Sequence, residues 1–259
     1  MLGAIAGDVI GSVYEHRPTK SRQLTLLPEG AGFTDDTVML LGVAAAILDD
    51  RPYALSLREF GRRHPEAGYG ASFMRWLFTD NAPSYRSWGN GAAMRVAPVA
   101  FAHDTEKGVL EEARRSAVIS HDHPEGIKGA QATALAVFMA RRGEHRTEIR
   151  RAIEQHFQYD LSRSLERIRP QYGFEVSCPG SVPEAILAFL ESDSFEGAVR
   201  NAVSLGGDAD TQACIAGAIA EAYYGGIPEG LEEAVRRCLS ADLLDVVERW
   251  RARYPLRAH

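Results

Sequence analysis

The sequence has few cysteines and no long apolar run, and each shortage excludes a class of protein. Three cysteines occur in 259 residues, and they stand far apart at Cys178, Cys214 and Cys238. An odd number of distant cysteines argues against a disulfide framework, and the chain has no C-x-x-C pair of the kind that binds structural zinc. No apolar run approaches the roughly 20 residues that a membrane-spanning helix needs.

Basic residues are also scarce, since 29 Lys and Arg face 35 Asp and Glu for a formal net charge of -6. Nonspecific nucleic-acid binding requires a basic surface, so nucleic acid is expected here only as a modified substrate. Glycines and an aspartate interrupt the first thirteen residues, which argues against a signal peptide. We therefore expect a cytoplasmic protein that does not bind membranes.

Alternating β-branched runs are rare, and the chain shows neither an internal repeat nor a long linker. Hydrophobic residues make up 45% of the chain and charged residues 25%, as in soluble globular proteins. We predict one compact, almost wholly α-helical domain over residues 1–259.

The most informative stretch is Gly206 to Ala213, where Asp208, Asp210 and Thr211 precede a long run of small and apolar residues. Glycine and aspartate followed by threonine make a good helix start, so capping alone could explain the pattern. Carboxylate and hydroxyl oxygens that converge on one point are also what a hard divalent cation requires. From this stretch alone, both capping and metal binding remain open.

A second stretch of the same kind lies at Phe33 to Thr37, again before a long apolar segment. One aspartate suffices for a cap, yet Asp35 and Asp36 are adjacent and have threonines on both sides. Two such helix starts that met in the core would bring four carboxylates together, and divalent cations would remove their repulsion. Oxygen-only ligands favour Mg²⁺ or Mn²⁺ over Zn²⁺.

The N-terminal segment has glycine at every fourth position, Gly3, Gly7 and Gly11, so one side of a helix there would lack side chains. Glycine destabilises a helix interior by up to ~1 kcal/mol, so this register predicts close approach by another backbone. Asp8, Ser12 and Glu15 share a second face, and we expect that face to belong to a site.

Two further segments carry candidate binding residues. Ser87 to Arg95 includes Gly89, Asn90 and Gly91 before an expected helix, which could cradle an anion or form a simple turn. His121 lies in a loop before a helix that continues through Ala140. Another helix is expected to open at Ser181 to Glu184.

Together these stretches resemble the ADP-ribosylglycohydrolase family, which includes the dinitrogenase reductase-activating glycohydrolases and the ADP-ribosyl-acceptor hydrolases. The matching segments occur in the family's order between positions 3 and 225. They are Gly3 to Asp8 with Gly11, Ser12, Tyr14 and Glu15, Phe33 to Thr37, Ser87 to Arg95, Ser120 and His121, Ser181 to Ala185, and Gly206 to Ala213.

The resemblance implies an all-α fold with two divalent cations, Mg²⁺ or Mn²⁺, and hydrolysis of the bond between the anomeric carbon of ADP-ribose and an acceptor. The acceptor would be a modified protein or small molecule, and ADP-ribose the product. Glu15 and Asp35 would be catalytic, Glu15 by helping to activate water. The implied metal ligands are Thr34, Asp35, Asp36, Asp208, Asp210 and Thr211, and the implied substrate contacts are Ser87, Trp88, Gly89, Asn90, Gly91 and His121.

The chain departs from the family in its short length, in the bulky Trp88 and in Glu221, where many relatives have a small residue. Two alternatives stay open. One is a helical metal-dependent phosphohydrolase that uses His-Asp pairs, here His103-Asp104 and His121-Asp122. The other is an ADP-ribose-binding or structural protein without catalysis.

Overall fold

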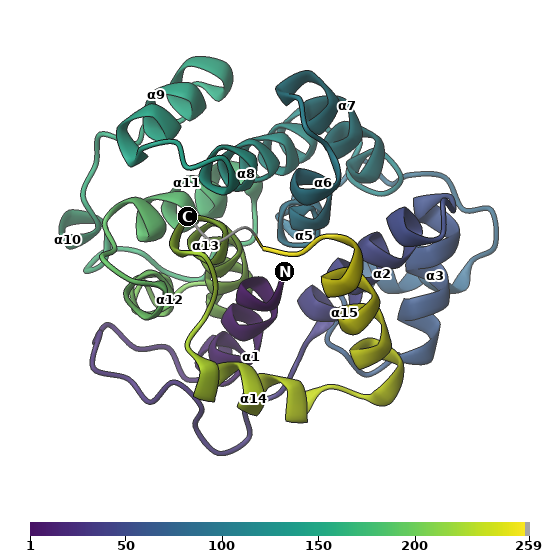
Figure 1. Ribbon diagram of the computed structural model, residues 1–259, viewed down its shortest axis with the longest axis horizontal. Coiled ribbons are helices and arrows are strands. Elements are labelled where there is room, and N and C mark those ends of the chain that lie inside the picture. Colours follow the sequence, from purple (N-terminus) through teal and green to yellow (C-terminus); the bar gives the residue numbers. More distant parts are fainter. Residues whose placement is uncertain (257–259) are drawn as a thin grey trace.

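This computed structural model describes residues 1–256, which contain fifteen α-helices joined by loops and no strand (Figure 1). The predicted all-α fold is confirmed. Residues 257–259, which the predicted domain included, lie outside the described residues. The helices are α1 (Leu2–His16), α2 (Asp35–Leu48), α3 (Tyr53–Arg63), α4 (Ala71–Phe78), α5 (Gly91–Met94), α6 (Ala97–Ala102), α7 (Glu106–Ala117), α8 (Pro124–Arg141), α9 (Arg146–Phe157), α10 (Leu165–Ile168), α11 (Cys178–Leu190), α12 (Phe195–Val203), α13 (Ala209–Tyr224), α14 (Glu229–Cys238) and α15 (Ala241–Arg253).

Helices α1 and α13 lie side by side in the middle of the molecule (Figure 1). The glycines of α1 make this contact, as their spacing predicts. A Cβ added to Gly7 would stand 2.0 Å from the carbonyl oxygen of Ala213, and one on Gly11 would stand 2.4 Å from Cα of Asp210. A side chain at either position would therefore push the two helices apart.

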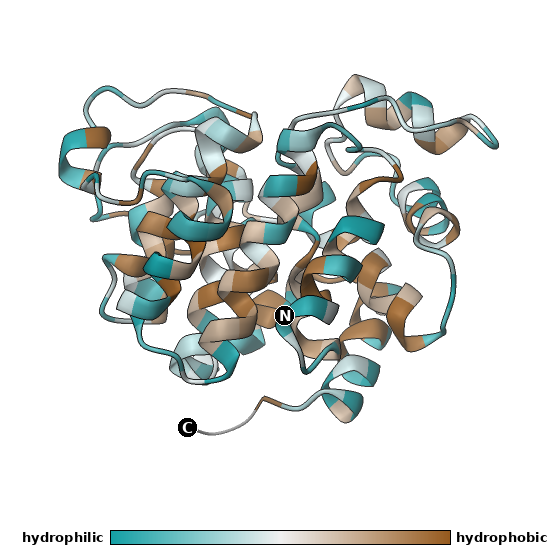
Figure 2. Cartoon of the chain, turned by 90° about the horizontal axis from the view of Figure 1, so that it is seen from above, coloured by the Kyte–Doolittle hydropathy of each residue, from teal (hydrophilic) through white to brown (hydrophobic). Residues whose placement is uncertain are grey.

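Apolar side chains fill the space around this central pair, and polar residues gather on the outer helices (Figure 2). Residues 209–222 of α13 are all buried, and α8, α11 and α12 pack against that helix. The same core continues into α2 and the helices beside it. This packing surrounds α1 and α13, so the residues at the C-terminal end of α1 and the N-terminal end of α13 are held in defined positions.

Helix α11 begins three residues earlier than predicted, at Cys178 rather than Ser181. The Ser177 side chain accepts a hydrogen bond from the Gly180 amide and caps the helix at the earlier point. The Cys178 amide also donates to the Trp88 carbonyl at 2.9 Å, and the Asn90 amide donates to the Val176 carbonyl at 2.8 Å. These bonds tie the loop before α5 to the loop before α11.

Within residues 1–256, no helix combines the length and the apolar character that crossing a membrane would require.

Candidate active site

A cavity of about 850 Å³ opens between the N-terminal ends of α2 and α13, the C-terminal end of α1 and the loop before α5. Every residue that the family resemblance assigns to catalysis, metal binding or substrate contact lines it, although they come from five separate stretches. These residues are Glu15, Thr34, Asp35, Asp36, Ser87, Trp88, Gly89, Asn90, Gly91, His121, Asp208, Asp210 and Thr211.

The two acidic helix starts meet in this cavity. The Thr211 hydroxyl at the start of α13 donates a hydrogen bond to Asp36 Oδ2 at the start of α2, at 3.2 Å. Asp36 and Asp210 are 2% and 5% exposed, so bulk water solvates neither carboxylate well. The predicted meeting of the two stretches is therefore confirmed.

Asp8 orients the start of α2 and, unlike Ser12 and Glu15 on the same helix, does not itself line the cavity. Its buried carboxylate accepts hydrogen bonds from the amide and hydroxyl of Thr34, at 2.9 and 2.7 Å, and from both donors of Thr37. Helical spacing alone could not reveal this, because Asp8 turns toward the neighbouring helix. Asp8 thus satisfies the free donors at the start of α2 and leaves Asp35 and Asp36 free to face the cavity.

The start of α13 is held by a different set of contacts. Gly206 has φ +65°, a conformation that favours glycine. Lys20 donates to the Leu205 carbonyl just before this turn and to the Tyr172 carbonyl of a separate loop. The Tyr172 hydroxyl in turn accepts a 2.9 Å bond from Gln212 Nε2. This bracing fixes the backbone that carries Asp208 and Asp210.

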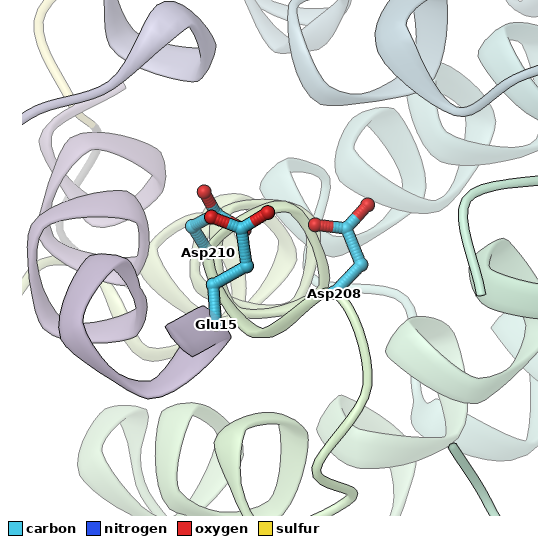
Figure 3. A group of neighbouring side chains, drawn as sticks. All are labelled: Glu15, Asp208 and Asp210. Carbon is cyan, nitrogen blue, oxygen red and sulfur yellow. The ribbon is translucent and has the colours of Figure 1, made fainter. Parts of the chain in front are cut away.

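Glu15, Asp208 and Asp210 form a compact acidic group in the site (Figure 3). One carboxylate oxygen from each lies within 4.8 Å of the others. Glu15 comes from the last turn of α1, one turn beyond Gly11, so the glycine contact with α13 brings it to Asp210. The family resemblance assigns Glu15 to water activation, yet here it stands where it could also share a cation.

Burial raises the pKa of the five carboxyls of the acidic group, Glu15, Asp35, Asp36, Asp208 and Asp210. It raises the pKa of Asp35 to about 8, with further contributions from the charges of Asp8 and Asp208. The pKa values of Asp36 and Asp210 lie well above the ordinary range, first through burial and then through neighbouring carboxylates. Burial also raises the pKa of Asp208 and, together with the Asp208 charge, that of Glu15. These groups must bind protons or cations to remain together.

The donor set fits a divalent cation. It consists of carboxylate and hydroxyl oxygens, the ligands that Mg²⁺ and Mn²⁺ prefer. Asp36 Oδ1 is buried and has no hydrogen-bond partner among the described residues, which leaves it free to serve as a ligand. Repulsion between the carboxylates supplies the electrostatic reason for a cation to bind.

The loop before α5 forms the opposite wall. Asn90 Nδ2 donates to Asp208 Oδ2 at 2.7 Å and lies 3.2 Å from the Ser181 hydroxyl, so this loop also orients an acidic side chain. Trp88 lines the cavity, is 57% exposed, and lies beside the His123 ring with the two ring planes tilted by 55°. The sequence predicts a loop of ligand contacts here, and it does not foresee that Asn90 contacts Asp208.

Tyr85, Arg95 and Phe174 are among the cavity residues to which the sequence assigned no role. Tyr85 and Phe174 lie in irregular loops and carry no pattern that would mark them. Arg95 does carry one, since it is a lone charge within the apolar segment 92–101 and is 1% exposed. Arg95 donates to the Ser120 hydroxyl at 2.8 Å, which in turn lies 2.8 Å from His121 Nδ1.

The His-Asp alternative gains no support from this arrangement. His121 lines the cavity, but His103 and Asp104 do not. Asp104 instead pairs with Arg141 on the surface, and Asp122 accepts a hydrogen bond from Ser84. The two His-Asp pairs therefore do not form one metal site.

Comparisons with known proteins agree with the family resemblance. The chain is 28% identical to ADP-ribosylhydrolase ARH3 of Bos taurus over 333 aligned positions, covering 94% of this chain and 89% of that protein. It is 25% identical to ADP-ribosylarginine hydrolase Tri1 of Pseudomonas putida, covering 91% of this chain and 72% of that protein. A solved structure described as an ADP-ribosylglycohydrolase-related protein complex matches with a TM-score of 0.72 and 28% identity, covering 96% of this chain and 95% of that one.

The family model for ADP-ribosylglycohydrolase matches residues 1–257, which is nearly the whole chain. With the helical fold and the acidic cavity at the matching stretches, this protein belongs to the ADP-ribosylglycohydrolase family of hydrolases.

Proposed function

We propose that this protein removes ADP-ribose from a modified acceptor by hydrolysing the bond at the anomeric carbon of the distal ribose. The observation that carries the proposal is the meeting of Asp36 and Asp210, from two distant helix starts, in one cavity with Glu15. An inert binding protein would gain nothing from burying so many carboxylates together, because their repulsion destabilises the fold.

The proposed metal ligands are Thr34, Asp35, Asp36, Asp208, Asp210 and Thr211, for two divalent cations, Mg²⁺ or Mn²⁺. When bound, such cations supply positive charge that orients ribose hydroxyls and makes a nearby water more acidic. Asp8 and Asn90 would keep the ligands in place, since each holds a cavity residue through hydrogen bonds. These partners of the ligands are expected to matter for metal affinity.

Glu15 is the proposed acceptor of the proton from the attacking water. The carboxylate lies at the edge of the acidic group and is only partly buried, so it can contact both water and ligand. As the water oxygen bonds to the anomeric carbon, one water proton passes to Glu15 and the bond to the acceptor breaks. The leaving acceptor takes up that proton, and Glu15 returns to its carboxylate form. The surrounding carboxylates favour the cation-like ribose of that transition state. Asp35, beside them, would hold a cation and contribute to this field.

The loop from Ser87 to Gly91 and the His121 ring are the proposed contacts of the ADP-ribose itself. Their place on the wall opposite α2 supports this assignment, because a ligand between the two walls would touch the acidic group at one end. An ADP-ribosylated protein or small molecule is the proposed substrate. ADP-ribosylated nucleic acid is a further candidate substrate. Because the protein carries a net negative charge, we expect it to bind only the modified end of such a nucleic acid and not its phosphate backbone.

Hydrolysis of ADP-ribosylated arginine, serine and nucleic-acid substrates in Mg²⁺ or Mn²⁺ tests the proposal. Asp36→Asn and Asp210→Asn should lower the rate by about 100-fold or more, because each removes charge from the reacting centre. Asp50→Asn is the matched control, since Asp50 is exposed and its positive φ of 49° suits asparagine. Full activity of either cavity variant would refute the assignment, and tight ADP-ribose binding without turnover would favour the non-catalytic alternative.

We further propose that residues 1–259 form one domain that works in the cytoplasm. A single continuous core over the described residues supports the first statement, and three free cysteines in those residues are compatible with the second.

A further inference from the structure

The hydrogen bonds behind His121 restrict which of its ring nitrogens can carry a proton. Arg95 Nη2 lies 2.8 Å from the Ser120 hydroxyl oxygen, and that oxygen lies 2.8 Å from His121 Nδ1. All three side chains are 5% exposed or less. An arginine can only donate hydrogen bonds, so the Ser120 oxygen must accept from Arg95.

The Ser120 hydroxyl still has one proton to place. Among the described residues, the groups bonded to its oxygen are Arg95, which cannot accept, and His121 Nδ1. Leaving a fully buried hydroxyl proton without an acceptor is unfavourable. The proton therefore points at Nδ1, and a neutral histidine that accepts at Nδ1 carries its own proton on Nε2.

The other two states of the ring fit less well. A proton on Nδ1, in the opposite tautomer or in the imidazolium, would face the Ser120 oxygen and leave the hydroxyl proton unpaired. The imidazolium would in addition place a second positive charge near Arg95. Burial, and then the Arg95 charge, lower the pKa of His121 well below its ordinary value, in agreement with a neutral ring.

The surroundings of Nε2 leave its proton free for a ligand. No described residue forms a hydrogen bond with Nε2, and the ring lines the cavity. The nearest part of the α5 loop is Gly91, where an added Cβ would lie only 3.1 Å from Nε2. The bare glycine thus keeps the edge of the ring open beside the proposed ligand loop.

We infer that Arg95 and Ser120 are positioning residues that hold His121 as the neutral Nε2–H tautomer, so that the ring donates one hydrogen bond to an oxygen of bound ADP-ribose. The identity of the ligand rests on the proposed function; the tautomer rests on the hydrogen bonds alone. In this role His121 is a fixed donor and does not exchange protons with the substrate.

Nitrogen-15 NMR of the histidine ring tests the tautomer directly, with His121→Gln used to assign the resonances. The expected spectrum has Nδ1 at the position of an unprotonated nitrogen and Nε2 at that of a protonated one. Ser120→Ala should convert this to a mixture of tautomers and weaken ADP-ribose binding by about two- to threefold, since only the fraction of rings that keeps the proton on Nε2 can donate to the ligand.

Ser116→Ala is the matched control. Ser116 is equally buried at the end of α7, but its hydroxyl donates to the Ala113 carbonyl and does not contact His121. This variant should keep both the tautomer and the affinity, and Ser120→Thr, which retains the hydroxyl, should restore the wild-type spectrum.

The inference is overturned by an Nδ1–H or imidazolium ring in the wild type, or by a Ser120→Ala spectrum that matches the wild type. If the wild type has the expected tautomer and binds ADP-ribose but hydrolyses none of the substrates, the inference stands and the proposed catalysis fails. If hydrolysis is found with the wrong tautomer, the reverse holds.

Discussion

At the scale of single residues, the site depends on side chains that orient the acidic group as well as on the acidic group itself. Asp8 holds Thr34 and Thr37, and Asn90 holds Asp208. The sequence did not predict any of these hydrogen bonds. A spacing pattern shows which side chains share a helix face, but the partner of a buried aspartate is set by how a second helix crosses the first.

Asn90 provides the sharpest test at this scale. Asn90→Ala should weaken divalent cation binding by about tenfold, because Asp208 loses the donor that fixes it. Asn90→Asp should weaken it further, since the new carboxylate would stand against Asp208 at the distance of a hydrogen bond, now 2.7 Å. Calorimetric titration with Mn²⁺ measures both.

Asn81→Asp serves as the control for Asn90→Asp, because Asn81 is exposed and its φ of 55° is one that aspartate tolerates. Cation affinity should not change in this variant. Equal affinity in Asn90→Asp and the wild type would show that Asn90 does not orient a metal ligand.

At the scale of elements, the glycines of α1 determine where Glu15 lies. A glycine every fourth residue predicts close approach by a backbone, and the structure confirms it with α13 as the neighbour. The sequence could not identify α13, because small residues also occur in α8 and α11. It also missed the start of α11 at Cys178, since the bond from the Cys178 amide to the Trp88 carbonyl comes from a loop 90 residues earlier.

Gly7→Ala should therefore damage both stability and the site. The added Cβ would lie 2.0 Å from the Ala213 carbonyl oxygen, so the two helices must separate. We expect the free energy of unfolding to fall by about 2–3 kcal/mol, as in other overpacked cores. Because the separation also moves Glu15 away from Asp210, Mn²⁺ affinity should fall in the fraction that remains folded.

Gly230→Ala makes the same chemical change in α14, where no atom lies within 4 Å of the added Cβ. That variant should be neutral or up to ~1 kcal/mol more stable, because alanine favours a helix more than glycine does. Urea unfolding compares the two. A Gly7→Ala protein as stable as Gly230→Ala would contradict the close contact of α1 with α13.

At the scale of the whole molecule, the family assignment was within reach of the sequence because the five site stretches keep their order along the chain. The alignment with the bovine relative runs over 333 positions, more than the 259 residues of this chain, so it includes segments that this chain lacks. The candidate ligands and substrate contacts nonetheless all line one cavity in this shorter chain.

The buried carboxyls couple the stability of the whole molecule to pH and to cations. A carboxyl whose pKa is raised on folding binds its proton more tightly when folded than when unfolded. Its effect is thus favourable to folding at low pH and is lost as the pH rises from the ordinary value near 3.8 toward the folded value, about 8 for Asp35. The carboxyls with lowered pKa, Asp80, Asp160 and Asp242, stay ionised between pH 6 and pH 8, so they do not change the trend there. His121 opposes it in part, because its buried ring is neutral and its contribution to stability rises as the pH passes the ordinary histidine value of 6.5.

The metal-free protein should consequently melt at a lower temperature at pH 8 than at pH 6, by roughly 3–5 °C if about 1–2 kcal/mol is lost. Saturating Mg²⁺ or Mn²⁺ should raise the melting temperature more at pH 8, where fewer protons compete for the ligands than at pH 6. A cation at 100 times its dissociation constant adds about 2.7 kcal/mol. Asp36→Asn removes one of the repelling charges, so its metal-free form should be more stable than the wild type at pH 8 and should respond less to the cation. Calorimetric melting with and without EDTA measures each difference. A wild-type protein whose metal-free form is most stable at pH 8, and which gains nothing from either cation there, would show that the carboxylates coexist without a shared ion.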